Sequence, residues 1–222
     1  MNNFMQMRQN MIAGQFLPGL IKNKKIIEHF GSTPREFFLP DQFQSLAYSD
    51  LNIKISNNRY VPSPFNTAKI FQEAELKGSE MILLIGANLG YEAAVLSKLV
   101  DTVVAIEENA DMKKKADANI KKVNAENILL LSSNHKLGHK KLGPYDIIIS
   151  LEPQNFIEDI LLDQLAERGK LFYCEKQKVN LNEGKLNVYY REGSRYIKKQ
   201  LFDLNIPSNK EKSICENKFN FC

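Results

Sequence analysis

Residues 81–99 read MILLIGANLGYEAAVLSKL, an apolar run that ends at Gly86 and that is followed, after Gly90, by a segment with helical spacing. A short continuous apolar run predicts a strand that is buried on both faces, as in a parallel sheet. Glycines between a strand and a helix predict a tight turn at the carboxyl edge of the sheet, where backbone N–H groups meet ligands. This stretch therefore predicts an α/β fold with a ligand site at that edge.

The same alternation continues on both sides of this stretch. Ser63 and Asn109 are suited to cap helices, and the turn Glu192-Gly193-Ser194 joins two strand-like runs that predict an antiparallel hairpin. We expect strands at 102–107, 127–131, 145–150 and 170–175, and helices at 4–13, 22–30, 63–75, 91–99, 110–122 and 156–167. A short strand is expected at 51–55. The fold class is therefore α/β, Rossmann-like, with a mostly parallel twisted sheet, an antiparallel C-terminal hairpin and a helical N-terminal extension.

We expect one structural unit, in which a leader of residues 1–60 packs on an α/β domain of residues 61–222. The chain has 222 residues, of which 43% are hydrophobic, and a net charge of +4, which excludes membrane-spanning, collagenous and disordered classes. That charge is too small to imply nucleic acid without a clustered patch. The cysteines Cys174, Cys215 and Cys222 form no metal motif, and no secretory signal is visible, so we expect a cytoplasmic protein.

Two histidines, His135 and His139, stand four residues apart, a spacing that can hold a metal on a helix. They lie in SSNHKLGHKKLGP, where Gly138, Gly143 and Pro144 favour a loop. We therefore expect two exposed loop histidines and no metal site.

Glu107 strengthens the prediction of a nucleoside site. It ends the second predicted strand, 17 residues after Gly90, where a carboxylate can accept both hydroxyls of a ribose. A dinucleotide would require G-x-G-x-x-G/A, and the corresponding residues Gly86, Asn88 and Tyr91 do not match it. S-adenosylmethionine sites commonly show G-x-G-x-G, which Gly86 and Gly90 match at two of three positions. The site thus favours S-adenosylmethionine over a dinucleotide, and a turn without any ligand stays open.

The chain resembles the protein-L-isoaspartate O-methyltransferase family from about Arg8 to Pro207. The resemblance rests on a leader with RQNMIAGQF (8–16), PREF (34–37) and AYSD (47–50), and on LIGANLGYEAAVLSKL (84–99), VVAIEE (103–108), GPYDIIIS (143–150) and LLDQLAERGKL (161–171). It implies a class I methyltransferase fold, S-adenosyl-L-methionine as cofactor, and methyl transfer to the carboxylate of isoaspartyl residues in damaged proteins or peptides.

The resemblance also implies site residues. Gly86, Asn88, Gly90 and Glu107 would bind the cofactor, and Asn134 would occupy the position of an aspartate that binds the adenine amino group. The family's G-Q-T-I-S-x-P segment corresponds to residues 58–64, so its active-site serine falls on Pro62. Ser63 would be the catalytic hydroxyl if the loop shifts by one residue.

These correspondences include departures at functional positions. Leu84 replaces an acid, Asn88 a glycine and Asn134 an aspartate, which predicts cofactor binding that is weakened or lost. A carboxyl methyltransferase therefore stands beside a non-catalytic relative that binds a partner. A third function, methylation of nucleic acid, is disfavoured because the loop Ser150-Leu151-Glu152-Pro153 lacks the Asn/Asp-Pro-Pro-aromatic pattern of amine methyltransferases.

Overall fold

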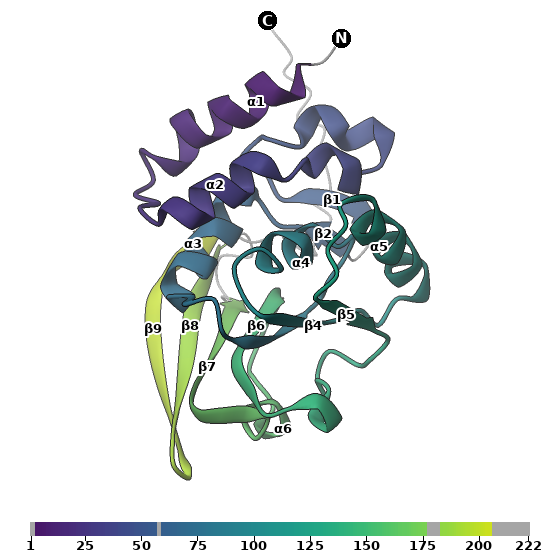
Figure 1. Cartoon of the computed structure of the whole chain (residues 1–222). Helices are drawn as coiled ribbons and strands as arrows, with labels where there is room; N and C mark the ends of the chain where they lie inside the picture. The colour runs from purple at the N-terminus through teal and green to yellow at the C-terminus, as the bar shows by residue number, and fades with distance from the viewer. Residues whose placement is uncertain (1–2, 57–58, 177–182, 206–222) are drawn as a thin grey trace, which may run out of the picture.

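The computed structural model describes residues 3–56, 59–176 and 183–205. Its centre is a seven-stranded sheet with the strand order β5-β4-β3-β6-β7-β8-β9 (Figure 1). The strands are β3 (Met81–Ile85), β4 (Thr102–Ile106), β5 (Ile128–Leu131), β6 (Tyr145–Gln154), β7 (Leu165–Lys176), β8 (Glu183–Glu192) and β9 (Arg195–Asn205). Strands β3 to β7 pair in parallel, whereas β8 and β9 pair antiparallel. The predicted mixed sheet with an antiparallel C-terminal hairpin is confirmed.

The helices are α1 (Phe4–Met11), α2 (Lys24–Ser32), α3 (Pro64–Ala74), α4 (Tyr91–Leu96), α5 (Ala110–Lys122) and α6 (Asp159–Leu162). Two of them begin where the sequence predicts, because side-chain oxygens satisfy free N–H groups of the first turn. Ser63 Oγ accepts a hydrogen bond from the Asn66 N–H at 3.1 Å, and Asn109 Oδ1 accepts one from the Met112 N–H at 3.0 Å.

The sheet is buried on both faces, as its continuous apolar strands predict. On one face, Ile82 and Leu84 of β3 share a core with the N-terminal helices, α3 and α4. On the other face, Leu83 and Ile85 pack with the residues of α6. Figure 1 shows this layering, with α1 to α3 on one side of the sheet and α6 on the other.

The N-terminal segment is tied to the α/β core through aromatic contacts. Phe30 of α2 and Phe38 lie 6.0 Å and 5.5 Å from the Tyr91 ring, measured between ring centroids. The segment also contains a π-helical turn (Ile12–Phe16), two 3₁₀ turns (Arg35–Phe38 and Asp41–Leu46) and an antiparallel hairpin of β1 (Ile53–Ser56) and β2 (Arg59–Val61). The sequence predicted β1 but not β2. The predicted boundary at residue 60 falls inside β2.

The predicted helix at 156–167 is wrong over most of its length. Only Asp159–Leu162 is helical, and β7 begins at Leu165, which pairs with Tyr145. The apolar residues Leu161, Leu162 and Leu165 have helical spacing, but all three are buried against the sheet, the last one as part of a strand. The register of β7 then shifts between Leu165 and Lys170, at a bulge that includes Arg168 with φ of +63°.

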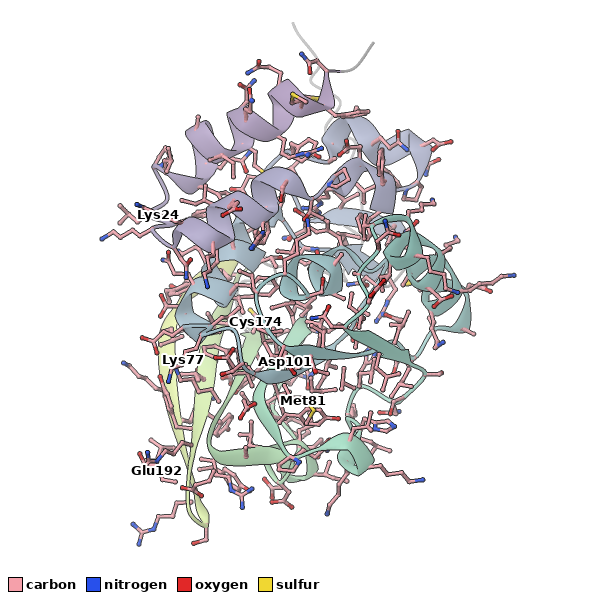
Figure 2. All side chains as sticks on the ribbon, viewed as in Figure 1. Lys24, Lys77, Met81, Asp101, Cys174 and Glu192 are labelled. Atoms are coloured by element: carbon pink, nitrogen blue, oxygen red, sulfur yellow. The ribbon has the colours of Figure 1, made fainter. Side chains whose placement is uncertain are left out.

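Most buried residues of the described ranges are apolar, but Arg35 and Glu92 are fully buried as well. Figure 2 shows Lys24 and Glu192 at the periphery and Cys174 in the interior. Cys174 is a free, buried thiol, and burial raises its pKa to about 12. Cys215 and Cys222 lie outside the described residues. Within the described ranges, every helix is too short or too polar to cross a membrane.

Candidate functional site at the carboxyl edge of the sheet

The predicted glycine turn links β3 to α4. The N–H groups of Gly86 and Ala87 both donate to the Ile106 carbonyl, at 3.1 Å and 3.0 Å, which holds the turn against the end of β4. Gly86 has φ of +82° and Gly90 has φ of +94°, backbone conformations that disfavour any side chain. A Cβ at Gly86 would also lie 3.0 Å from Glu152 Cγ. Both glycines are therefore required by backbone geometry and close packing.

Asn88 occupies the middle of this turn with φ of +50°. Its side chain is buried and folds back on the turn, where Nδ2 donates to the Gly86 carbonyl at 3.2 Å. Its Oδ1 is buried and has no hydrogen-bond partner within the described part of the chain. An asparagine tolerates this conformation better than most residues, but glycine would fit it without strain.

Glu107 lies directly against this turn, as predicted. Its carboxylate is fully buried and accepts hydrogen bonds from the N–H of Asn88 at 2.9 Å and from the N–H of Asn109 at 3.0 Å. The structure thus brings Gly86, Asn88 and Glu107 into one site, in which Asn88 is hydrogen-bonded both to the Gly86 carbonyl and to the Glu107 carboxylate. Gly90 closes the same turn, because its N–H donates to the Ala87 carbonyl at 2.8 Å.

Arg59 and Glu152 complete the site, and neither was predicted from the sequence. Arg59 projects from β2, and its guanidinium forms ion pairs with both Glu107 and Glu152. Its side chain is only 11% exposed. The two acids lie at the carboxyl edge, Glu107 directly after β4 and Glu152 in β6, the strands on either side of β3, and two acids brought together there need a cation nearby.

His135 corrects another prediction, because it is buried rather than exposed. Its Nε2 accepts a hydrogen bond from the Glu108 N–H at 3.2 Å, so the ring proton is assigned to Nδ1, which donates to Glu152 at 2.9 Å. Burial, the largest cause, lowers the pKa of His135. His139 is half-buried, and its carbonyl accepts from the Tyr145 hydroxyl at 2.7 Å.

One acidic cluster has metal-ligand composition. Donor atoms of Glu108, His135 and Glu152 all lie within 4.8 Å of one another. Both ring nitrogens of His135 already have hydrogen-bond partners, however, and Glu152 is paired with Arg59. A cation would have to break these interactions, so the arrangement fits a hydrogen-bonded ion-pair network better than a metal site.

Asn134 lies on the rim of the site. It is exposed, and its Oδ1 accepts from the Lys136 N–H at 2.9 Å. Together with Glu108, His135 and Glu152 it lines a pocket of about 280 Å³. Asn134 therefore faces the space beside the ion-pair network, and no hydrogen bond connects it to Glu107 within the described residues.

Arg59 is the first residue of β2, and Ser63 lies two residues after the last one, Val61. Its hydroxyl is buried and accepts the capping bond from Asn66, and its own N–H donates to Asn52 Oδ1 at 3.0 Å. The preceding Pro62 carbonyl accepts from Arg35 Nη2 at 2.8 Å. The segment that holds the predicted catalytic hydroxyl is thus anchored at two adjacent residues, Pro62 and Ser63. Within the described residues, Ser63 makes no hydrogen bond to any of the predicted cofactor residues.

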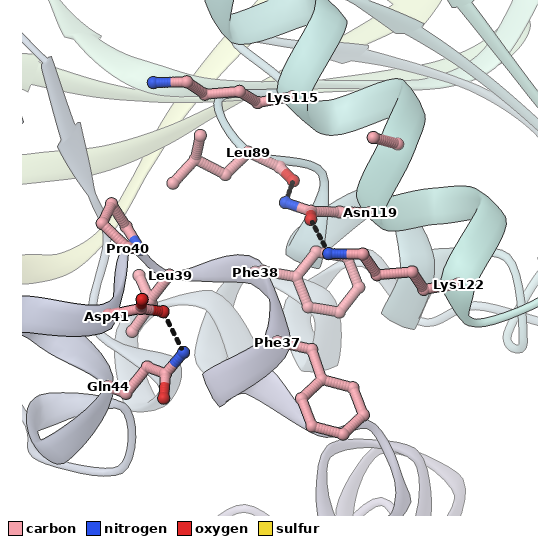
Figure 3. Close-up of a pocket in the computed structure, with 11 residues that line it drawn as sticks. Phe37, Phe38, Leu39, Pro40, Asp41, Gln44, Leu89, Lys115, Asn119 and Lys122 are labelled. Carbon is pink, nitrogen blue, oxygen red and sulfur yellow. Dashed lines mark hydrogen bonds between the residues drawn. The ribbon is translucent and has the colours of Figure 1, made fainter.

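A larger pocket, of about 610 Å³, lies on the outer side of the glycine turn (Figure 3). Leu89 and Phe38 contribute apolar surface, and Lys115 and Lys122 contribute cations from α5. Asn119 Nδ2 donates to the Leu89 carbonyl at 3.1 Å and so connects α5 to the turn (Figure 3). Neither Glu107 nor Glu152 lines this pocket, so it is separate from the site around Glu107.

Comparison with known proteins identifies relatives along most of the chain. The family model for protein-L-isoaspartate(D-aspartate) O-methyltransferase (PCMT) matches residues 6–202. Protein-L-isoaspartate O-methyltransferase 1 of Syntrophobacter fumaroxidans is 33% identical over 171 residues, which cover 77% of this chain and 80% of the relative. The enzyme of Methanoregula boonei is 28% identical over 194 residues, covering 87% and 88% of the two chains.

Solved structures agree in fold. A Plasmodium falciparum protein assigned as a protein-L-isoaspartate O-methyltransferase, in complex with S-adenosyl-L-homocysteine, superposes with a TM-score of 0.78 at 21% identity. The match covers 95% of this chain and 99% of that one. The family model spans both the N-terminal segment and the sheet with its glycine turn and Glu107. The chain therefore belongs to the protein-L-isoaspartate O-methyltransferase family.

Proposed function

We propose that this protein transfers a methyl group from S-adenosyl-L-methionine to the carboxylate of L-isoaspartyl residues in damaged proteins or peptides. The observation that carries the proposal is the buried Glu107 carboxylate held against the glycine turn, in a chain of this family. A carboxylate at the end of the second strand beside a strand-to-helix turn is suited to accept hydrogen bonds from the ribose hydroxyls of an adenosine. The compartment that we propose is the cytosol, which the free Cys174 thiol supports.

In this proposal the cofactor residues are Gly86, Asn88, Gly90, Glu107 and Asn134. Glu107 accepts hydrogen bonds from ribose hydroxyls, and the glycines let the backbone approach the ligand closely. Asn134 faces the pocket beside Glu108 and offers an amide oxygen to the adenine amino group. When bound, the cofactor supplies an activated methyl group on its sulfonium.

The chain's own task on the acceptor side is positioning. A carboxylate is already nucleophilic, so no general base is required, and alignment of the two reactants lowers the barrier. Ser63 uses its oxygen as an acceptor in the helix cap, which leaves its hydroxyl proton available for a substrate carboxylate. We assign Ser63 this role, with the Pro62 carbonyl anchored by Arg35 to fix the segment.

The test is a pair of synthetic peptides that differ only in isoaspartate against aspartate at one residue. We expect a base-labile methyl ester on the isoaspartyl peptide and none on its twin. Ester lability separates carboxyl methylation from methylated lysine, which survives mild base. Absence of ester at saturating S-adenosyl-L-methionine, in a folded sample that binds the cofactor, would overturn the proposal.

That negative result would favour the non-catalytic alternative, in which the fold binds a protein partner. Pro62 is the observation that favours this alternative, because it lacks both a hydroxyl and an N–H where the family has its active-site serine. Bound cofactor without ester on either peptide distinguishes the two functions.

A further inference from the structure

The guanidinium of Arg59 lies where a bound nucleoside would need to meet Glu107. The two oxygens of a carboxylate offer about four acceptor positions. Three of those on Glu107 are used, by the N–H groups of Asn88 and Asn109 and by Arg59 Nη2. A ribose diol needs two acceptor positions, so it can bind Glu107 through both hydroxyls only if Arg59 leaves.

We propose that Arg59 is a built-in competitor for the cofactor, which holds Glu107 and Glu152 in the free protein and must be displaced when S-adenosyl-L-methionine binds. Arg59 is thereby a residue that sets cofactor affinity. The inference rests on the proposed function only in taking S-adenosyl-L-methionine and its demethylated product as the ligands of this site.

The ion pairs of Arg59 with Glu107 and Glu152 are strong enough to compete with the cofactor for Glu107. Glu107 is fully buried, and Arg59 compensates its charge as well as that of Glu152. Ion pairs that also make hydrogen bonds, in a buried setting, are the stronger kind. A ligand without comparable positive charge at this position gains the Glu107 hydrogen bonds only after this pair has been broken.

The contact is also imperfect, which keeps it reversible. Nη1 and Nη2 of Arg59 each have a carboxylate partner, whereas the buried Nε has no hydrogen-bond partner within the described residues. A buried N–H without a partner is costly. On leaving the site, the guanidinium regains water for all its N–H groups.

Arg59 can move without disturbing the acceptor side. It is the first residue of β2 and pairs with Ser56 of β1. The register of the hairpin shifts directly beside this pair, between Lys54 and Ser56. The other end of the segment is fixed independently, through the Pro62 carbonyl on Arg35 and the Ser63 N–H on Asn52. A rotation of the Arg59 side chain therefore leaves Ser63 in place.

The experiment measures binding of S-adenosyl-L-homocysteine by isothermal titration calorimetry to the full chain, without any methyl acceptor. If Arg59 occupies the site nine-tenths of the time, the apparent dissociation constant is tenfold above the intrinsic one. We expect Arg59→Gln to tighten binding by tenfold or more. Arg195→Gln, at an exposed residue of β9, is the matched control and should leave affinity unchanged.

A second variant covers the case in which Arg59→Gln fails to fold. Glu152→Gln removes one of the two charges that hold Arg59 but keeps an acceptor for His135 Nδ1. It should tighten binding by a smaller factor, about threefold, because Glu107 still attracts Arg59. A purely structural Arg59 would lower the melting temperature without improving affinity in either variant.

Unchanged or weaker binding in folded Arg59→Gln, or in Glu152→Gln if the former does not fold, would overturn the inference. The same holds if neither folded variant binds the ligand. Because no methyl transfer is measured, failure of this inference is distinguishable from failure of the proposed function, which the peptide assay tests separately.

Discussion

Replacing Asn88 with glycine tests whether the side chain in the middle of the turn limits cofactor binding. Asn88 is 2% exposed, and Nδ2 is bonded to the Gly86 carbonyl, so its side chain occupies the interior of the turn that would face the cofactor. We expect Asn88→Gly to bind S-adenosyl-L-homocysteine more tightly than the parent, with no loss of stability.

The substitution has opposing effects on the free energy of unfolding. Glycine relieves about 1 kcal/mol of left-handed backbone strain at φ of +50° and removes a buried Oδ1 without a partner, a cost of about 1–3 kcal/mol. It loses one hydrogen bond, about 1 kcal/mol, and adds about 0.5–1 kcal/mol of unfolded-state entropy. We therefore expect a net change between zero and about 2.5 kcal/mol of added stability, so the variant should be no less stable than the parent.

The substitution can only increase the affinity for the cofactor. If the cofactor can bind only when the Asn88 side chain moves, the bond to the Gly86 carbonyl must break, which costs about 1 kcal/mol and corresponds to roughly fivefold in affinity. Titration calorimetry should show at least this gain. Asn124→Gly is a matched control, since Asn124 is also an asparagine at positive φ, +52°, but is exposed at the end of α5. Equal affinity of Asn88→Gly and parent would refute the reasoning.

Three further predictions concern capping, packing and pH. Ser63→Ala should lose about 1 kcal/mol of stability with the helix cap and lower ester formation without changing S-adenosyl-L-homocysteine affinity, whereas Ser63→Thr should keep both; unchanged ester formation by folded Ser63→Ala would remove Ser63 from the acceptor side. Gly90→Ala should cost about 2 kcal/mol, because its Cβ would lie 3.1 Å from Ile120 Cγ1 at φ of +94°; a drop of roughly 4–8 °C in melting temperature checks this, and an unchanged value contradicts it. Burial lowers the pKa of His135, so the unfolded chain binds the proton more readily, and stability should fall as the pH drops below 6.5. Urea titrations at pH 7.5 and 5.5 should show a smaller difference for His135→Gln than for the parent, and an equal difference would assign the pH dependence to other groups.

Local signals predicted the parts of the fold that local interactions determine. Helix α5 spans the predicted residues 110–122, and its start follows from Asn109, whose side-chain oxygen accepts a hydrogen bond from the free Met112 N–H of the first turn. Strands β3 and β4 are continuous apolar runs, and the turn between β3 and α4 has the glycines that its positive φ angles require. Glu107 followed from strand order alone, since parallel strands present their carboxyl ends at one edge.

Two of the failures involve contacts between residues distant in the sequence. The spacing of Leu161, Leu162 and Leu165 suits a helix, yet Leu165 pairs with Tyr145 as a strand, which no periodicity within the segment reveals. His135 was expected to be exposed because Gly138, Gly143 and Pro144 favour a loop, but its ring is buried and hydrogen-bonded to Glu152, 17 residues later.

Arg59 shows most clearly why the site needed the structure. A single arginine in a short hairpin carries no local signal of burial, and arginine is ordinarily exposed. Its placement follows from its ion pairs with Glu107 and Glu152. Glu107 directly follows β4 and Glu152 lies in β6, and these two strands flank β3. Two acids brought that close at the carboxyl edge require a cation or protonation when no ligand is bound. The same two acids that make the edge of this sheet suitable for a nucleoside therefore also make it suitable for Arg59, and the relative strength of the two interactions determines how tightly the chain binds its cofactor.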